Sequence, residues 1–193
     1  MSSRDSILKN IRKNNKSETA YPEIKIDGIS YDNIVDVFSE NLELAGGKSI
    51  HVTSEQNCTN IIADLFPAEN ITLLSFEESI KSNIDINKIQ TGHALKDLDL
   101  TVIRAELGVA ENGAIWLNPE QFKHRASLFI CQHLIIILDK TKLVNNMHEA
   151  YEKIDFDKVE YGLFISGPSK TADIEQALVI GAHGPRSCSV LLV

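Results

Sequence analysis

The chain has 193 residues, a formal net charge of −8 and an apolar fraction of 43%, values ordinary for one globular domain. The acidic balance argues against a nucleic-acid partner, because binding a phosphate backbone requires a concentrated basic face. No apolar run approaches the ~20 residues of a membrane span, and the N-terminus lacks the apolar core of a signal peptide. We therefore expect a cytoplasmic protein with no membrane span.

The three cysteines are widely spaced in the sequence. Cys58, Cys131 and Cys188 form no C-x-x-C pair, which argues against an iron–sulfur or zinc site held by this chain alone. The six histidines are scattered without metal-ligand spacing. We expect neither a metal site nor a cofactor bound by this chain alone.

The N-terminal part is predicted to contain three helices. Residues 1–30 should form a short helix over about 3–13, followed by a polar, extended connector. Residues 31–45 carry apolar side chains at three- and four-residue steps, which predicts an amphipathic helix that stops at Gly46-Gly47. Ser54 is the predicted N-cap of the next helix, which should end near Pro67. We place one α/β domain over residues 31–193.

The rest of the chain alternates predicted strands and helices. β-like runs occupy residues 48–52, 71–74, 98–103, 114–117, 134–138, 162–166 and 188–193. The run LIIIL at 134–138 is typical of a central strand covered on both faces. Residues 104–112 are predicted to be a turn region, and residues 143–153 a helix. This alternation predicts an α/β fold with a mostly parallel sheet and flanking helices.

The tract Gly108–Gly113 (GVAENG) lies between two predicted strands and is bounded by glycines. Glycine permits backbone conformations or close approaches that a Cβ atom would forbid. Open α/β sheets bind ligands at strand ends, so Glu111 is a candidate catalytic carboxylate, and Asn112 and Gly113 are candidate ligand contacts. The competing interpretation is a tight turn with a solvated glutamate.

A second tract, Ser166–Glu175 (SGPSKTADIE), follows a predicted strand and is rich in donors and charges. These groups could hold an anion where a helix starts, with a lysine adding positive charge. The alternative is a capped helix, with Ser169 or Thr171 as N-cap and the acidic residues near its N-terminal dipole. The candidate ligand residues are Gly167, Ser169, Lys170, Thr171, Asp173 and Glu175.

A histidine between two glycines marks the stretch Gly181–Arg186 (GAHGPR). His183 could act as a general base or bind substrate near neutral pH, and Gly184 would bring backbone close to a ligand. A turn with one structural histidine hydrogen bond is the alternative. Arg125, beside His124, could reach an anionic ligand, although a solvated pair is the simpler interpretation.

These residues resemble the C-terminal signature of the LUD-domain family, which includes the LutC/YkgG proteins. The run SGPSKTADIEQALVIGAHGPRSCSVLLV matches its G-P-S-x-T-A-D-I-E stretch, its G-x-H-G-P element and its apolar last strand. The runs GVAENGAIWL and HRASLFICQHLIIIL match two further family tracts, so that the resemblance covers about residues 98–193. It implies a fold like that of the NagB/RpiA/CoA-transferase group.

The resemblance also implies a function. LutC-like proteins are associated with oxidation of L-lactate to pyruvate, together with partner proteins that carry iron–sulfur clusters. A LutC-like chain would thus bind a small anionic ligand or such iron–sulfur subunits, while the clusters stay on the partners. Association with further copies of itself is left open.

One departure from the family pattern suggests a different enzyme. Asn112-Gly113-Ala114 stands where the family usually has Thr-Gly-Thr, so two hydroxyls are lost. The resulting E-N-G is similar to the tract that holds the nucleophilic glutamate of family I CoA transferases. An acyl- or CoA-transferring enzyme that uses Glu111 as nucleophile is therefore one alternative. A non-catalytic interaction module is the other.

Overall fold

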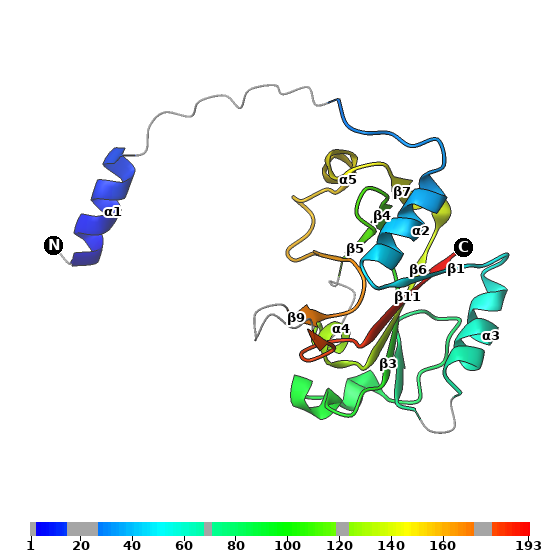
Figure 1. The fold of residues 1–193 in the computed structure, drawn as a ribbon. Coiled ribbons are helices and arrows are strands. Elements are labelled where there is room, and N and C mark those ends of the chain that lie inside the picture. The colour runs from blue at the N-terminus through cyan, green and yellow to red at the C-terminus, as the bar shows by residue number, and fades with distance from the viewer. Residues whose placement is uncertain (1–2, 15–26, 68–70, 119–123, 172–178) are drawn as a thin grey trace.

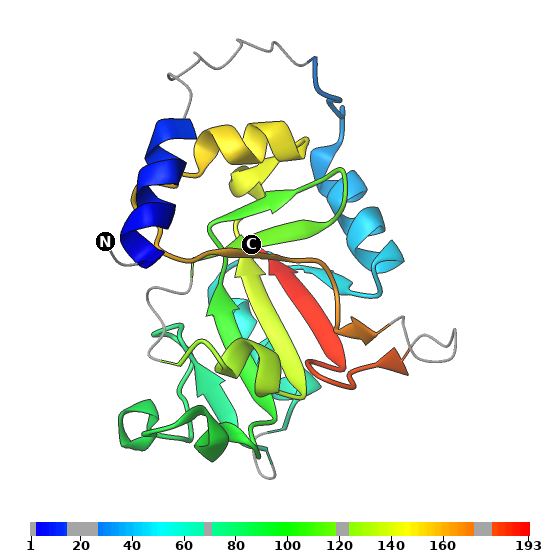
Figure 2. The ribbon, with the colours of Figure 1, turned by 90° about the vertical axis from the view of Figure 1, so that its left-hand side faces the viewer.

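The computed structural model describes residues 3–14, 27–67, 71–118, 124–171 and 179–193. A five-stranded sheet lies at its centre, and every neighbouring pair of strands in it is parallel. Figures 1 and 2 show this sheet in two views. Its strands, in spatial order, are β1 (Lys48–His51), β11 (Ser187–Leu192), β6 (His133–Leu138), β3 (Leu100–Arg104) and β2 (Leu73–Ser75). The prediction of a mostly parallel sheet is confirmed.

Strand β6 is central because its side chains are apolar on both faces. Ile135 and Ile137 pack on one side in a cluster with Cys58 and Ile62 of helix α3 (Gln56–Leu65). Alternate residues of β6, including Ile136, pack on the opposite side in the largest core cluster. Each fully buried aliphatic side chain of this kind contributes ~1.5–3 kcal/mol to folding. The sheet is therefore covered on both faces.

A second sheet of four strands covers one face of the first. Its order is β7 (Leu143–Val144), β4 (Leu107–Val109), β5 (Ala114–Leu117) and β8 (Leu163–Ile165). β4 and β5 pair antiparallel as a hairpin, β8 pairs antiparallel with β5, and β7 pairs parallel with β4. The turn predicted over 104–112 was wrong in part, since β4 lies inside it. The glycine at position 108 favoured the prediction of a turn, although this residue pairs within the sheet.

The second sheet lies between the central sheet and helix α5 (Met147–Lys153). Ile115 and Leu117 of β5 belong to the core shared with the central sheet, whereas Ala114 and Trp116 belong to the cluster that includes α5. The helix predicted from residue 143 was wrong at its start, because residues 143–144 form β7. α5 instead begins after Asn146, whose side-chain oxygen accepts the backbone N–H of Glu149 at 3.0 Å.

Further helices complete the structure. α2 (Ile34–Leu44) is the predicted amphipathic helix, and its Phe38 and Leu42 are fully buried. The cap predicted at Ser54 was wrong, because Glu55 holds the N-cap position of α3. The remaining helical segments in the described ranges are α1 (Ser3–Asn14), α4 (Ser127–Ile130) and the 3-10 turns η2 (Ile86–Lys88), η3 (Gly92–Leu95) and η5 (Lys140–Lys142). None of the helices in the described ranges combines the length and the apolarity that a bilayer crossing needs.

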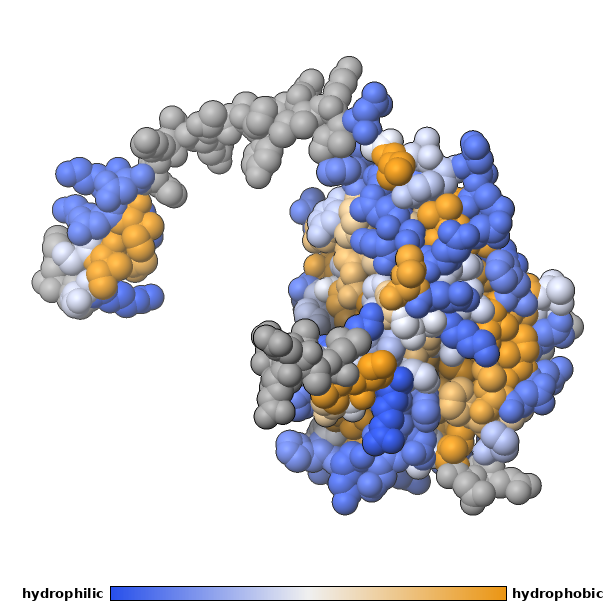
Figure 3. Space-filling model, in the orientation of Figure 1, coloured by the Kyte–Doolittle hydropathy of each residue, from blue (hydrophilic) through white to orange (hydrophobic). Residues whose placement is uncertain are grey.

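Helix α1 has the predicted apolar stripe, but the stripe is exposed. Ile7 and Ile11 each keep 56% of their surface accessible, and no residue of α1 is buried. Figure 3 shows the apolar residues of this helix gathered on one side, with hydrophilic residues beside them. The division of the chain at residue 30 stays a prediction.

Two glycines allow loops to lie directly on the backbone of α2. Gly113 has a φ of +63°, and a Cβ atom there would stand 2.5 Å from the nitrogen of Leu42. Gly167 has a φ of +71°, and a Cβ atom there would stand 2.3 Å from the carbonyl oxygen of Ala45. These contacts are with backbone, so no side-chain movement relieves them. Glycine is required at both positions.

Gly113→Ala should destabilise the protein by at least about 2 kcal/mol. Alanine would be strained in the left-handed backbone conformation of this position, and its Cβ atom would also clash with the backbone of α2. Equilibrium unfolding in urea measures this free energy. The matched control is Gly92→Ala, since its Cβ atom would meet only the Cβ of Ala126, at 3.3 Å. A Gly113→Ala protein as stable as the control would show that the turn does not rest on α2.

The pH dependence of stability should include His133. Burial lowers the pKa of this imidazole, as does Arg186, while Asp99 acts in the opposite direction. The unfolded chain therefore binds the proton more readily than the folded one, so stability is retained above about pH 6.5 and falls as the pH drops through the lowered pKa. Unfolding measured across this range should show the fall, and His133→Gln should reduce it. An unchanged pH profile in His133→Gln would refute the assignment.

Candidate functional site

The two sequence tracts meet in the structure. The Ser166 hydroxyl donates a hydrogen bond of 2.9 Å to the backbone carbonyl of Asn112. Next to this bond, Gly113 and Gly167 both rest on the C-terminal half of α2. Segments separated by more than fifty residues are thus fixed against one helix. Their proximity is a result of the fold that spacing alone did not reveal.

The first tract forms the turn of the β4–β5 hairpin. Asn112 is exposed, and its side-chain oxygen accepts the backbone N–H of Ala114 at 3.0 Å. Glu111 is half-buried, and its backbone N–H donates to the carbonyl of Asn145 at 3.0 Å. The side chain of Asn41 in α2 also donates to the carbonyl of Ala110, at 2.8 Å. These hydrogen bonds anchor the turn to α2 and to Asn145. The role of Glu111 as a nucleophile stays a prediction.

The second tract does not begin a helix at its described residues. Lys170–Thr171 forms a short strand, β9, that pairs antiparallel with β10 (Val179–Ile180). The backbone N–H of Ser169 donates to the carbonyl of Pro185, and the N–H of Gly181 donates to the carbonyl of Ser169, both at 2.9 Å. The capped-helix interpretation was therefore wrong for Ser169, because the two residues that follow it form a strand. The interpretation of Thr171 as an N-cap stays a prediction, because the residues after it lie outside the described ranges. The candidates Asp173 and Glu175 lie outside the described residues.

A cavity of about 320 Å³ brings five of the candidate residues together. It lies beside the amino ends of β6 and β11, since Leu134 is the second residue of β6 and Pro185 comes just before β11. The candidate residues that line it are Gly167, Ser169, Lys170, His183 and Gly184. The rest of its wall consists of Leu128, Phe129, Leu134, Ile165, Ser166, Pro168 and Pro185. An apolar floor thus meets a rim with a cation, hydroxyls and an imidazole.

Close packing shapes the rim of this cavity. A Cβ atom at Gly184 would lie 2.9 Å from the Cβ of Ser169, so the two loops touch. Lys170 lies over Gly46, where a Cβ atom would stand 3.5 Å from its Cε. Lys170 and His183 are both exposed, and a ligand in the cavity could reach them from solvent.

Two groups of candidates lie elsewhere. Glu111 and Asn112 do not line this cavity, although the Ser166 bond ties their turn to its wall. Arg125 is also outside it, and its guanidinium carbon lies 4.7 Å from the centre of the Tyr161 ring. Arg125 is therefore not part of the cavity lined by His183 and Lys170.

The cysteines are part of the core. All three are buried as free thiols. Burial raises the pKa of the Cys131 thiol to about 11 and that of Cys188 to about 12. Burial also raises the pKa of Cys58. Thiols of this kind stay protonated and unreactive at neutral pH.

Sequence reasoning missed the apolar wall of the cavity. Leu128 and Phe129 belong to α4, which was not predicted, and Leu134 belongs to β6, whose pattern indicated only a covered strand. The run HRASLFICQHLIIIL could have drawn attention to them, since it was one of the family-like tracts. Apolar side chains carry no chemical signature, however, and only the fold shows which of them face a cavity.

Comparison with known proteins agrees with this structure. The profile of the family described as "LUD domain" matches residues 85–193. A lactate utilization protein C from Geobacillus kaustophilus is 29% identical over 147 residues, which cover 72% of this chain and 58% of that protein. One from Bacillus pumilus is 36% identical over 100 residues, which cover 48% of this chain and 41% of that protein. The chain thus spans little more than half the length of the Geobacillus relative.

A solved structure shares the fold. The crystal structure of a DUF162 family protein from Deinococcus radiodurans superposes with a TM-score of 0.66 and 16% identity, covering 86% of this chain and 99% of that chain. The family profile extends over more than half of the sequence, and it includes the second tract, the glycine–histidine stretch and the hairpin turn. The chain belongs to the LUD domain family.

Proposed function

We propose that this chain is a LutC-like component of an L-lactate utilization system in the cytoplasm. It binds a small anionic ligand at the cavity lined by Ser169, Lys170 and His183. Oxidation of L-lactate to pyruvate takes place with partner proteins that carry the iron–sulfur clusters. The proposal rests on family membership and on relatives named lactate utilization protein C.

One observation links the family signature to a site. The segments Ser166–Lys170 and His183–Pro185 belong to the matched region, and they line one cavity together. Two loops that served only as connections would not be expected to line the same cavity. Binding residues, in contrast, are commonly placed on loops that a rigid scaffold positions.

The chemistry of the cavity suits a small hydroxy acid. The Lys170 ammonium group and the Ser169 hydroxyl can bind a carboxylate, and charge-assisted hydrogen bonds are the stronger kind. The imidazole of His183 can exchange a proton near neutral pH or bind a hydroxyl group. Leu128 and Leu134 supply an apolar wall that a methyl group would fit. L-lactate carries these three groups.

Deletion of the gene in its native host should abolish or strongly slow growth on L-lactate as sole carbon source. Growth on pyruvate should be unaffected, because pyruvate enters after the step that the system performs. Complementation with the wild-type gene should restore growth. Unimpaired growth of the deletion strain on L-lactate would count against the proposal.

The double substitution Lys170→Ala, His183→Ala should fail to restore growth on L-lactate, because it removes the cation and the imidazole from the rim. Both side chains are exposed, so the variant should keep wild-type stability in unfolding experiments. A matched control is His93→Ala, Lys96→Ala, which removes the same residue types from an exposed 3-10 turn. The control should complement fully.

Full complementation by the cavity variant would favour the non-catalytic interaction module instead. In that case the variant should still co-purify with its iron–sulfur partners as the wild type does. Loss of growth with retained co-purification would assign the cavity to ligand binding. Growth and complex formation therefore distinguish the two roles.

A further inference from the structure

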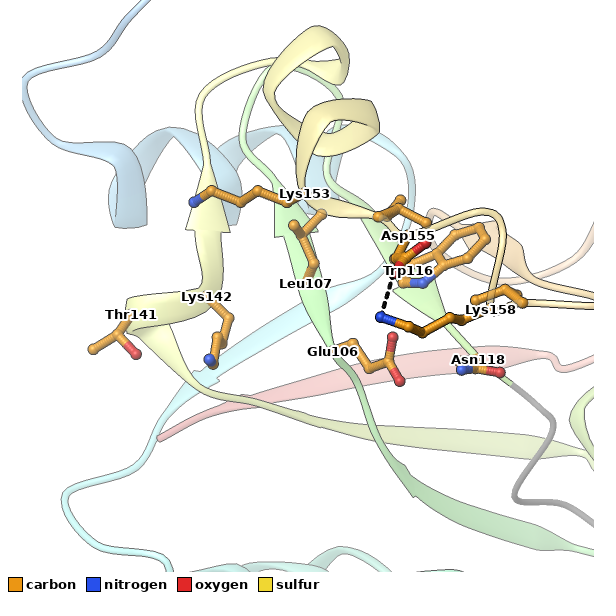
Figure 4. A pocket seen from close by; sticks show the side chains of 11 residues that line it. Glu106, Leu107, Trp116, Asn118, Thr141, Lys142, Lys153, Asp155 and Lys158 are labelled. Atoms are coloured by element: carbon orange, nitrogen blue, oxygen red, sulfur yellow. Dashed lines mark ion pairs between the residues drawn. The ribbon is translucent and has the colours of Figure 1, made fainter.

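A second cavity, of about 540 Å³, lies at the opposite end of the central strands. Glu106 and Leu107 line it just after β3, and Thr141 and Lys142 line it soon after β6. Carboxyl ends of parallel strands are where open α/β sheets bind their ligands. Figure 4 shows the lining side chains coming from these strand ends, from β5, and from α5 and the loop after it. The other lining residues are Trp116, Asn118, Lys153, Ile154, Asp155, Lys158 and Val159.

Trp116 contributes an unused hydrogen-bond donor to this cavity. The side chain is only 4% exposed, and its indole Nε1–H has no hydrogen-bond partner within the part of the chain that the structure describes. Its six-membered ring is fixed against Gly162, where a Cβ atom would stand 2.0 Å from Cη2. Figure 4 shows the indole nitrogen on the side toward Asp155 and Lys158. A buried donor without an acceptor is rare in folded proteins and indicates a missing partner.

The charge of the cavity is positive within an acidic protein. Three lysines and two carboxylates line it, while the chain as a whole carries −8. Lys158 pairs with Asp155, with 2.6 Å between Nζ and Oδ2. Lys142 and Lys153 form no ion pair with any described residue. Their positive charge is therefore available to a ligand.

We propose that this cavity binds a small oxyanion that carries carboxylate or phosphate groups. Lys142 and Lys153 attract its carboxylate or phosphate group, and one of its acceptor atoms takes the Nε1–H of Trp116. The volume lies within the range of about 300–1,000 Å³ that is usual for small-molecule sites. Neither Lys170 nor His183 lines this cavity, so binding here does not depend on the role in lactate utilization.

The chain contains one tryptophan, which makes the proposal directly measurable. A ¹⁵N–¹H correlation spectrum of the full chain should contain one indole resonance, that of Trp116. Citrate and inorganic pyrophosphate serve as carboxylate and phosphate probes in separate titrations. At least one of them should shift the indole resonance in a saturable way. Saturation by one probe alone would identify which oxyanion the cavity prefers.

Two variants test the roles of the residues. Lys142→Ala, Lys153→Ala should weaken binding at least about tenfold, and raising the salt concentration should weaken the wild type as well, because exposed charges are screened. The control Lys88→Ala, Lys96→Ala removes two exposed lysines elsewhere and should bind like the wild type. Trp116→Phe keeps most of the ring, and calorimetry should show weaker binding to it. If neither probe shifted the indole resonance, or if the shifts persisted unchanged in Lys142→Ala, Lys153→Ala, the proposal would be overturned.

Discussion

The fold depends on the need to cover strand β6 on both faces. Its apolar side chains alternate between two core clusters, so neither face can be left to water. Helix α3 closes one side, while α2, α4 and the second sheet close the other. Once β6 is enclosed, its neighbours β3 and β11 are buried too, and only loops beyond the strand ends remain free for binding. Both cavities are found there.

The second sheet also shapes the wall of the first cavity. Its hairpin brings the turn around Asn112 down onto α2, and β8 leads the chain back to the same helix. Because Gly113 and Gly167 have no side chains, both loops approach the helix backbone more closely than other residues would allow. The bond from Ser166 to Asn112 then ties the loops to each other. The wall of the first cavity therefore follows from backbone packing.

The sequence was informative about long periodic elements but missed several of the short ones. The run of residues 134–138 indicated a doubly covered strand, and the apolar steps of 31–45 indicated α2, because burial selects side chains at regular intervals. β4, β7 and β9 have only two or three residues each, too few for a period to appear. Tertiary pairing decided their conformation. Gly108 illustrates this, since its local signal favoured a turn and its pairing with Ile115 made it part of a strand.

The candidate site could be predicted in part for a related reason. Ser169, Lys170 and His183 were found because they combine reactive groups with glycine and proline in a recognisable order. Their convergence on one cavity depends on how β8, β9 and β11 are connected, which spacing does not encode. Lys142, Lys153 and Trp116 had no such signature, because lysines on a surface and a tryptophan in a core are ordinary features. Their significance appears only when the fold places them around one space.

Strand β6 has a further consequence, because the two cavities lie at its two ends. Its six residues span roughly 20 Å, and packing on both faces keeps that length fixed. This separation exceeds the distance of about 8 Å over which charges act through physiological salt. Solvent-exposed charges at the two ends are therefore largely screened from each other. The strand therefore works as a rigid spacer between the two cavities.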